Sequence, residues 1–345
     1  MAGKVTLREI AQEAGVSVSA VSLVLNNRPC RVSDAARARI KEVARKKRYI
    51  PNQIARSLVT KRSNTLGLIV PNITSRYFSS IARDIELRAR EQGYTLFIMN
   101  SGEGEDSAAL DAELLQLLIN RGADGIFLVV SNEAAPAPEL VDTLTLAPVP
   151  VMLVDRSLAG VPCDKVRFDS ERGGYLACRH LLEQGHRRIA CMVNLRSHTG
   201  EERLTGYRRA LSDAGVAYDE GLVFQSTYYI ADAYRAAAGV IGTDATAVFA
   251  SSDNIALGLL KRVYAQGLRV PQDLSVVSYD NSAADALFEP ALTAIEQNAS
   301  DLAARAMEQM LTRLAEQDAG EDAAEPVEML LSPRLVINES VRDLG

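Results

Sequence analysis

Carboxylates stand at the ends of several short apolar segments of this chain. Each segment has the length and composition of a buried strand. The carboxylates are Asp155, Asp169, Asp253 and Asp280. Because the carboxyl ends of parallel strands face a common cleft, such groups can hold the hydroxyls of a small polar molecule by several hydrogen bonds. Any one of them is also a normal helix cap or turn residue, so only their convergence would indicate a site.

Residue patterns typical of catalysis are missing. The chain contains no Gly-x-x-x-x-Gly-Lys phosphate loop, no Gly-x-Ser-x-Gly elbow and no His-Glu-x-x-His zinc motif. Gly102 and Gly104 follow an expected strand, but the glutamates at Glu103 and Glu105 would repel a pyrophosphate. The histidines and cysteines have the spacing of neither a catalytic set, a metal site nor a disulfide framework: His180, His186, His198, Cys30, Cys163, Cys178 and Cys191. The sequence therefore predicts a protein that is not an enzyme and that has no cofactor and no metal.

Strand and helix patterns alternate through residues 63–345, which we call the body. The expected strands are 65–70, 94–100, 124–130, 149–155, 166–169, 188–193, 222–225, 247–250 and 274–279. The expected helices are 78–91, 107–120, 173–182, 202–214, 231–241 and 255–265. Strands separated by helices form parallel sheets. The two series, which divide before residue 166, predict two doubly wound α/β subdomains with a cleft at the strand carboxyl ends.

Residues 1–62, which we call the head, begin with two short helices joined at a glycine. Thr6 and Glu9 have the spacing of a capping box, and Gly15 can adopt the left-handed conformation of a turn. Ser17 then caps a second helix, whose exposed positions are all small or uncharged: Val18, Ser19, Ala20, Ser22 and Leu23. These positions suit a recognition helix in a major groove, although an ordinary helical hairpin fits the same residues.

Charge is distributed unevenly between the head and the body. The head has 14 Lys and Arg against 4 Asp and Glu, whereas the body has 24 against 40, and the whole chain has a formal net charge of −6. A basic head neutralises phosphates, which supplies most of the non-specific affinity for nucleic acid, while an acidic body avoids it. The charge therefore favours a helix-turn-helix that binds DNA.

A third helix is expected from its cap at Ser33 to Tyr49, and it ends in the basic run 45–48. These cations suit a helix C-terminus for dipole reasons alone, and they would also lie well for contacts to a DNA backbone. Pro51 ends this helix and starts a segment of about two turns, too short to be stable alone in water. We expect residues 51–62 to form a hinge that orders on DNA.

The sequence also bears on the compartment. No apolar run reaches membrane-spanning length, and no apolar secretory stretch follows the first charge. We expect a cytoplasmic protein with reduced cysteines. An exported sugar-binding protein of a transport system is the alternative, because such a protein would have the same kind of two-subdomain fold as the body. An exported protein of this kind would need a signal peptide and would lack the basic head, so the sequence disfavours this alternative.

The head resembles that of the LacI/GalR family of bacterial transcription regulators. The matching strings of the head are residues 5–7, 14–17, 21–22, 25–26, 49–52 and 55–58. The matching strings of the body are residues 185–190, 203, 206–207, 270–276 and 290–293. The resemblance covers essentially the whole chain. It implies an all-α helix-turn-helix head, a body like the type I periplasmic binding proteins, and a homodimeric repressor that binds a palindromic operator under the control of an effector.

For the head, the resemblance implies a set of DNA contacts. Val18, Ser19 and Leu23 match positions at which family members read bases, and Leu58 matches the hinge leucine that wedges into the minor groove. The implied DNA-binding residues are Thr6, Ser17, Val18, Ser19, Ala20, Ser22, Leu23, Asn26, Tyr49, Asn52, Ala55, Arg56 and Leu58. The loop at residues 26–33 is one residue longer than in some members, but it lies between two helices and changes the register of neither.

For the body, the resemblance implies a small-molecule effector in the cleft. Arg203, Asp253 and Asp280 match the family's effector-contacting positions, and aromatic residues are candidates for stacking on an apolar ring face. The predicted effector-binding residues are Tyr77, Phe78, Asp155, Arg203, Tyr228, Asp253 and Asp280. A carbohydrate is expected. Ser252 and Asn194 depart from residues frequent in sugar-binding members, so the identity of the sugar stays open.

The expected domain limits follow from these patterns and from the resemblance. The helix-turn-helix domain comprises residues 1–50, the hinge 51–62 and the effector-binding and dimerisation domain 63–345. Within the latter, the first subdomain is expected at about 63–164 and 298–325, and the second at about 165–297 and 326–345. The acidic residues 315–325 are expected to form a surface loop. Whether the effector releases or strengthens operator binding stays open, as does dimer against tetramer.

Overall fold

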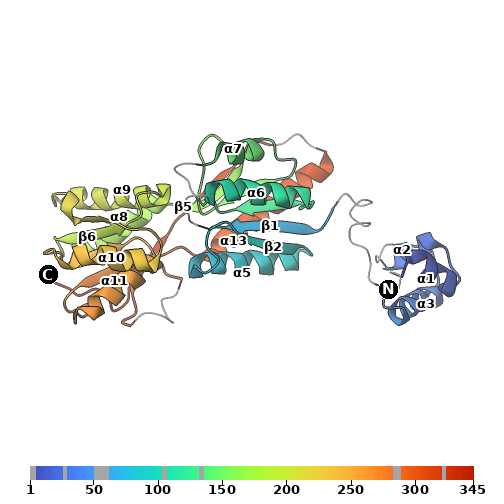
Figure 1. The fold of residues 1–345 in the computed structure, drawn as a ribbon, viewed down its shortest axis with the longest axis horizontal. Helices are drawn as coiled ribbons and strands as arrows, with labels where there is room; N and C mark the ends of the chain where they lie inside the picture. Colours follow the sequence, from blue (N-terminus) through green and yellow to red (C-terminus); the bar gives the residue numbers. More distant parts are fainter. Residues whose placement is uncertain are drawn as a thin grey trace. The chain divides into compact units, whose positions relative to one another are not determined.

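The computed structural model describes residues 5–25, 29–49, 62–102, 107–131, 136–282, 289–320 and 324–345. The chain divides into two compact units, Met1–Ser63 and Asn64–Gly345 (Figure 1). Their boundary differs by one residue from the one used above, and from here on head and body denote these two units. Each unit is described by itself. Among the described residues, no helix has both the length and the apolar character needed to cross a lipid bilayer.

The described part of the head contains α1 (Leu7–Ala14), α2 (Val18–Leu25) and α3 (Asp34–Lys46). The three helices pack around one small apolar core. Its buried members are Ile10, Ala11, Ala14, Val21, Val24, Ile40, Val43 and Ala44. Because these side chains recur at helical spacing in each segment, each helix turns one face inward and leaves the opposite face to solvent.

The limits of α1 follow from three residues. Thr6 Oγ1 accepts a hydrogen bond from the backbone N–H of Glu9, and the Glu9 carboxylate accepts one from the backbone N–H of Thr6, both at 3.3 Å. This capping box satisfies two amides that otherwise lack a helical partner. Gly15 ends the helix at a φ of +67°, which favours glycine. The predicted helix-turn-helix is confirmed.

The described part of the body contains two six-stranded sheets, which are parallel except for the antiparallel pair β10 and β12. The first sheet, in the order β11-β5-β4-β3-β1-β2, consists of β1 (Thr65–Val70), β2 (Thr95–Asn100), β3 (Gly125–Leu128), β4 (Val151–Val154), β5 (Asp164–Phe168) and β11 (Glu328–Leu331). The second, in the order β12-β10-β9-β8-β6-β7, consists of β6 (Ile189–Val193), β7 (Val223–Gln225), β8 (Ala247–Ala250), β9 (Ser275–Asp280), β10 (Thr293–Glu296) and β12 (Arg334–Val336). The two predicted α/β subdomains are confirmed.

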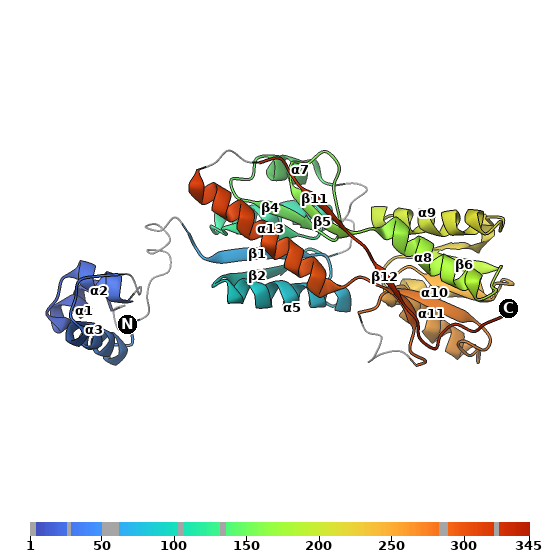
Figure 2. The ribbon, with the colours of Figure 1, turned by 180° about the vertical axis from the view of Figure 1, so that it is seen from behind.

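Helices cover both faces of each sheet. They are α5 (Arg76–Glu91), α6 (Ser107–Asn120), α7 (Pro138–Thr145), α8 (Ser170–Glu183), α9 (His198–Asp213), α10 (Ile230–Ile241), α11 (Asp253–Ala265) and α13 (Ala299–Ala319), with a 3-10 turn η1 (Glu220–Leu222) before β7. On the first sheet, α6 and α7 lie on one face and α5 and α13 on the other (Figure 1). Figure 2 shows α13 lying across the first sheet. On the second sheet, α8 packs beside α9, and α10 beside α11.

Two strands belong to a different subdomain from the one expected. The strand β5 pairs with β4, and β11 pairs with β5, so both lie in the first sheet. The expected limits after residues 164 and 325 are therefore wrong by several residues, because a strand's own residues do not say which of two sheets it joins. The expected loop at 315–325 is also wrong at its start, since α13 continues to Ala319 and ends where Gly320 adopts a φ of +70°.

Glycines bring α8 and α9 into backbone contact. A Cβ at Gly174 would lie 2.1 Å from the carbonyl oxygen of Arg203, and a Cβ at Gly206 would lie 1.9 Å from that of Glu171. Only a glycine fits at either place, so each helix is held directly against the backbone of the other. This packing fixes the position of α9, and of the side chains that it carries, relative to α8.

Candidate functional site

A cavity of about 170 Å³ lies between the two subdomains, where β4, β8 and β9 end. All the predicted effector-binding residues line it: Tyr77, Phe78, Asp155, Arg203, Tyr228, Asp253 and Asp280. Asp169, the remaining strand-end carboxylate, instead caps α8 by accepting a hydrogen bond from the backbone N–H of Arg172 at 2.8 Å. Of the four strand-end carboxylates, Asp155, Asp253 and Asp280 therefore converge on the cavity, whereas Asp169 is a helix cap.

Asp155 is a buried carboxylate in the wall formed by the first subdomain. It follows β4 with a φ of +65°, a left-handed conformation that aspartate tolerates better than most residues. Its Oδ1 accepts a hydrogen bond from the Tyr77 hydroxyl at 2.8 Å. Burial raises the pKa of Asp155 to about 6, although the charge of Arg156 and the hydrogen bond from Tyr77 pull it the other way. The cavity therefore holds a carboxylate whose charge is costly to the fold.

Asp253 and Asp280 lie together in the wall formed by the second subdomain. Asp253 accepts hydrogen bonds from the hydroxyls of Ser278 and Ser282 at 2.8 and 2.7 Å and from the backbone N–H of Ser282 at 2.8 Å. Asp280 accepts one from the side-chain amide of Gln297 at 2.9 Å and one from the backbone N–H of Asp253 at 3.4 Å. Burial raises the pKa of Asp280, with the nearby Asp253 adding to it and Arg203 opposing it. Asp253 has more partners within the protein, so Asp280 has more capacity left for a ligand.

Arg203 extends from α9 into the cavity and is only 4% exposed. Its Nη1 donates a hydrogen bond to the carbonyl oxygen of Ser251 at 2.6 Å, and its guanidinium carbon lies 3.7 Å from the centre of the Tyr279 ring. Its Nε is buried and has no hydrogen-bond partner among the described residues. A buried, charged donor without a partner is costly, so a bound molecule that accepts from it would be stabilised.

Arg156 is a site residue that the sequence reasoning missed. Its guanidinium carbon lies 5.3 Å from the centre of the Phe78 ring and 5.6 Å from that of Tyr228, which belongs to the other subdomain. Its Nη1 donates to the carbonyl oxygens of Val130 and Ser131 at 2.9 and 3.0 Å. The available signal was an arginine directly after the strand-end Asp155, which itself follows four apolar residues.

The arrangement is suited to binding rather than to catalysis. Carboxylates and guanidinium groups from both subdomains surround a small space whose other walls include the rings of Phe78 and Tyr228. The Tyr228 hydroxyl is buried and has no partner within the part of the chain that the structure describes. Charged groups of both signs form strong hydrogen bonds to hydroxyls, while the rings cover apolar faces. None of the described lining residues is a histidine or a cysteine.

The predicted DNA-binding residues of the head are partly described. Thr6, Ser17, Val18 and Ser19 are exposed, and the partly buried members are Ala20, Ser22, Leu23 and Tyr49. Ser17 Oγ caps α2 by accepting from the backbone N–H of Ala20 at 3.2 Å. Asn26, Asn52, Ala55, Arg56 and Leu58 lie outside the described residues. Of the five α2 positions predicted to be exposed, only Val18 and Ser19 are exposed, because Ala20, Ser22 and Leu23 are partly covered by the packing of the head.

Comparisons with known proteins find the same family of transcriptional regulators for the head and for the whole chain. Residues 6–52 match the model for bacterial regulatory proteins of the lacI family, and residues 178–341 match that of the periplasmic binding protein-like domain. The chain is 31% identical over 343 residues to the HTH-type transcriptional repressor PurR of Vibrio atlanticus, with 99% of each chain covered. The chain belongs to the lacI family. This lacI-family member is also 31% identical over 344 residues to the HTH-type transcriptional regulator DegA of Bacillus subtilis, with 99% of each chain covered.

Solved structures of lacI-family regulators share the fold. A transcriptional regulator CelR–cellobiose complex has a TM-score of 0.69 at 30% identity and matches 97% of this chain and 99% of its own. A lacI-family regulator from Enterococcus faecium with bound ribose has a TM-score of 0.72 at 28% identity and matches 81% and 100%. The lac repressor dimer bound to operator has a TM-score of 0.84 at 24% identity and matches 99% and 100%, which shows the fold. The relatives are transcriptional regulators and not enzymes. The predicted family, the predicted fold and the prediction of a regulator rather than an enzyme are therefore confirmed.

Proposed function

We propose that this lacI-family regulator is a homodimeric, cytoplasmic repressor whose operator affinity is set by a carbohydrate in the body's cavity. The observation that carries the proposal is the convergence of Asp155, Arg203 and Asp280 from two subdomains, with one buried donor of Arg203 that has no partner among the residues described. Buried charges are costly unless they are paired, so groups held in this way favour a site that a polar ligand completes.

The ligand class follows from the cavity walls and from two structural neighbours. The walls combine hydrogen-bonding charges with the rings of Tyr77, Phe78 and Tyr228, which suits a molecule with hydroxyls around an apolar ring face. The neighbours with bound cellobiose and bound ribose support the same class. We therefore assign a sugar or sugar derivative to the cavity, with Tyr77, Phe78, Asp155, Arg203, Tyr228, Asp253 and Asp280 as its contacts.

The head is assigned to a palindromic operator. Val18, Ser19 and Leu23 on α2 would read base edges in the major groove, and the other predicted head residues would fix the helix on the backbone. Leu58 would wedge into the minor groove from the hinge. Closure of the body around a sugar would move the first subdomains of a dimer relative to each other, and so change the spacing of the two hinges.

A thermal-shift screen tests the ligand assignment. The full chain is heated with a panel of sugars, sugar phosphates and purines, and a compound at 100 times its dissociation constant is expected to stabilise the body by roughly 2.7 kcal/mol. Arg203→Met removes a cavity donor, whereas Arg172→Met, which removes an exposed guanidinium on α8, is the matched control. A sugar that stabilises the wild type and Arg172→Met but not Arg203→Met supports the assignment. Stabilisation by purines alone, or by no compound, contradicts it.

A further inference from the structure

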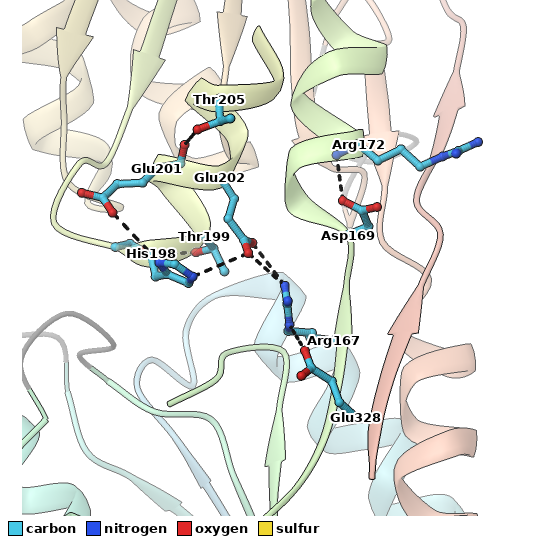
Figure 3. Close-up of polar contacts among 10 residues, drawn as sticks. Arg167, Asp169, Arg172, His198, Thr199, Glu201, Glu202, Thr205 and Glu328 are labelled. Atoms are coloured by element: carbon cyan, nitrogen blue, oxygen red, sulfur yellow. Dashed lines mark hydrogen bonds and ion pairs between the residues drawn. The ribbon is translucent and has the colours of Figure 1, made fainter. Parts of the chain in front are cut away.

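A cluster of charged side chains joins the two subdomains beside the places where the chain passes between them. Arg167 of β5 donates from Nε to Glu328 of β11 at 2.8 Å, which is a contact within the first sheet. From Nη1 it donates to both carboxylate oxygens of Glu202 on α9, at 3.1 and 3.3 Å, which is a contact to the second subdomain. Figure 3 shows Arg167 between these two glutamates and His198 on the other side of Glu202. The His198 Nε2 atom lies 3.6 Å from Oε1 of Glu202.

The pair formed by Arg167 and Glu202 is shielded more than a normal surface ion pair. The two side chains are 18% and 20% exposed, whereas the nearby contact of His198 with Glu201 joins side chains that are 53% and 62% exposed. Exposed pairs are weak because water and salt screen them and because two long side chains must be ordered. Here the guanidinium is already oriented by Glu328, so less freedom is lost when Glu202 binds.

The helix that carries Glu202 also carries part of the cavity wall. Thr199 and Arg203 are four residues apart on α9 and both line the cavity, while Glu202 lies on the neighbouring face toward Arg167. Glu202 and Arg203 are neighbours on α9, and α9 is held against the backbone of α8 at Gly174 and Gly206. A movement of Glu202 relative to β5 would therefore move Arg203 as well. The ion pair between Arg167 and Glu202 therefore influences the position of Arg203, although neither of its members lines the cavity.

A second contact between the subdomains lies inside the cavity. Arg156 of the first subdomain stands 5.6 Å from the centre of the Tyr228 ring of the second, and both residues line the space that a ligand would occupy. A bound molecule would compete with that contact. Arg167 and Glu202 do not line the cavity, so their contact can persist in the occupied and in the empty protein.

We propose that Arg167 and Glu202 form a latch that holds the two subdomains closed, and that they are positioning residues for the effector site. The inference rests on the proposed effector function for its significance, but the latch itself acts on the empty protein. It sets the fraction of molecules in which Arg203 faces Asp155 across the cavity. Because a ligand binds only that fraction, the latch also sets the sugar concentration needed for a response.

The latch is tested by the width of the cleft in the ligand-free, full-length chain. Spin labels at Glu113→Cys on α6 and Ser212→Cys on α9, both exposed, report the distance between the subdomains, in a background with Cys30→Ser. Labelled chains are diluted with unlabelled chains so that only distances within one chain are read. Glu202→Gln is expected to raise the ratio of long to short distances roughly tenfold, since it removes the charge from a partly buried, charge-assisted contact.

Matched variants separate the latch from general damage. Glu201→Gln changes the neighbouring exposed glutamate and is expected to leave the distances as in the wild type. Arg167→Met is expected to widen the cleft as Glu202→Gln does, and the double variant is expected to be no wider than either. A Glu202→Gln chain that melts cooperatively with wild-type distances, or additive effects in the double variant, would overturn the latch. No sugar is added, so a failed sugar screen would reject the proposed function and leave this result standing.

Discussion

Replacing Asp155 with asparagine removes one buried charge from the cavity while keeping its shape. The side chain has the same size, and asparagine tolerates the φ of +65° at this position. Its amide oxygen can still accept the hydrogen bond that the Tyr77 hydroxyl donates to Oδ1. We predict that Asp155→Asn makes the body more stable at neutral pH.

The magnitude follows from the raised pKa. Burial is the largest cause of the shift and lifts the pKa of Asp155 from 3.8 to about 6. Each unit of pKa corresponds to about 1.4 kcal/mol, so the ionised carboxylate lowers the free energy of unfolding by roughly 3 kcal/mol above pH 6. Between about pH 6 and pH 4 the folded protein takes up a proton that the unfolded chain does not, and this cost disappears. The advantage of Asp155→Asn should therefore be largest at high pH and vanish near pH 4.

Urea unfolding followed by circular dichroism at several pH values measures the difference. The control is Asp213→Asn on α9, which removes an exposed carboxylate and should leave the free energy of unfolding of the body almost unchanged. If Asp155→Asn is less stable than the wild type at pH 8, or if its advantage does not shrink as the pH falls through 6, then the carboxylate is not destabilising and the reasoning is refuted.

Further predictions concern the head and the packing of the body. Thr6→Ala should lower the stability of the head by about 1 kcal/mol and leave the melting of the body unchanged, because it removes the capping box of α1; equal melting of the head in both proteins would contradict this. Gly206→Ala should lower the free energy of unfolding of the body by at least 1–3 kcal/mol in urea, since its Cβ would overlap a carbonyl of α8. Ser19→Ala should change which duplexes are selected from a random library, whereas Lys46→Ala should weaken binding to all duplexes and reduce the salt dependence. If the two variants behave in the same way, the assignment of α2 as the recognition helix is wrong.

Features that depend on near neighbours in the chain were predictable. The capping box of Thr6 and Glu9 and the turn at Gly15 depend on residues a few positions apart, and the structure has all of them. The strands of the body likewise show as apolar runs between helices. Strand-end carboxylates were predictable as a class because parallel topology sends those ends to one edge.

Features that depend on distant parts of the chain were not predictable. Arg156 is a cavity residue because Phe78 and Tyr228, far away in the sequence, bring their rings to it. The sheet that β5 joins is decided by its pairing with β4 and β11 rather than by its own residues. The pair formed by Arg167 and Glu202 has the same origin, since only the packed body shows that β5 faces α9.

The central claim, control of operator binding by a sugar in the cavity, is tested most directly by operator affinity. The affinity of the wild type and of Arg203→Met for a selected palindromic duplex is measured with and without the sugar found by thermal shift. The account predicts that the sugar changes the affinity of the wild type. Arg203→Met should bind the duplex equally well without sugar and should need roughly 10-fold to 150-fold more sugar, because a charge-assisted hydrogen bond contributes about 1.5–3 kcal/mol. A wild-type affinity that the sugar leaves unchanged, or a variant that responds at the same concentration, would contradict the account.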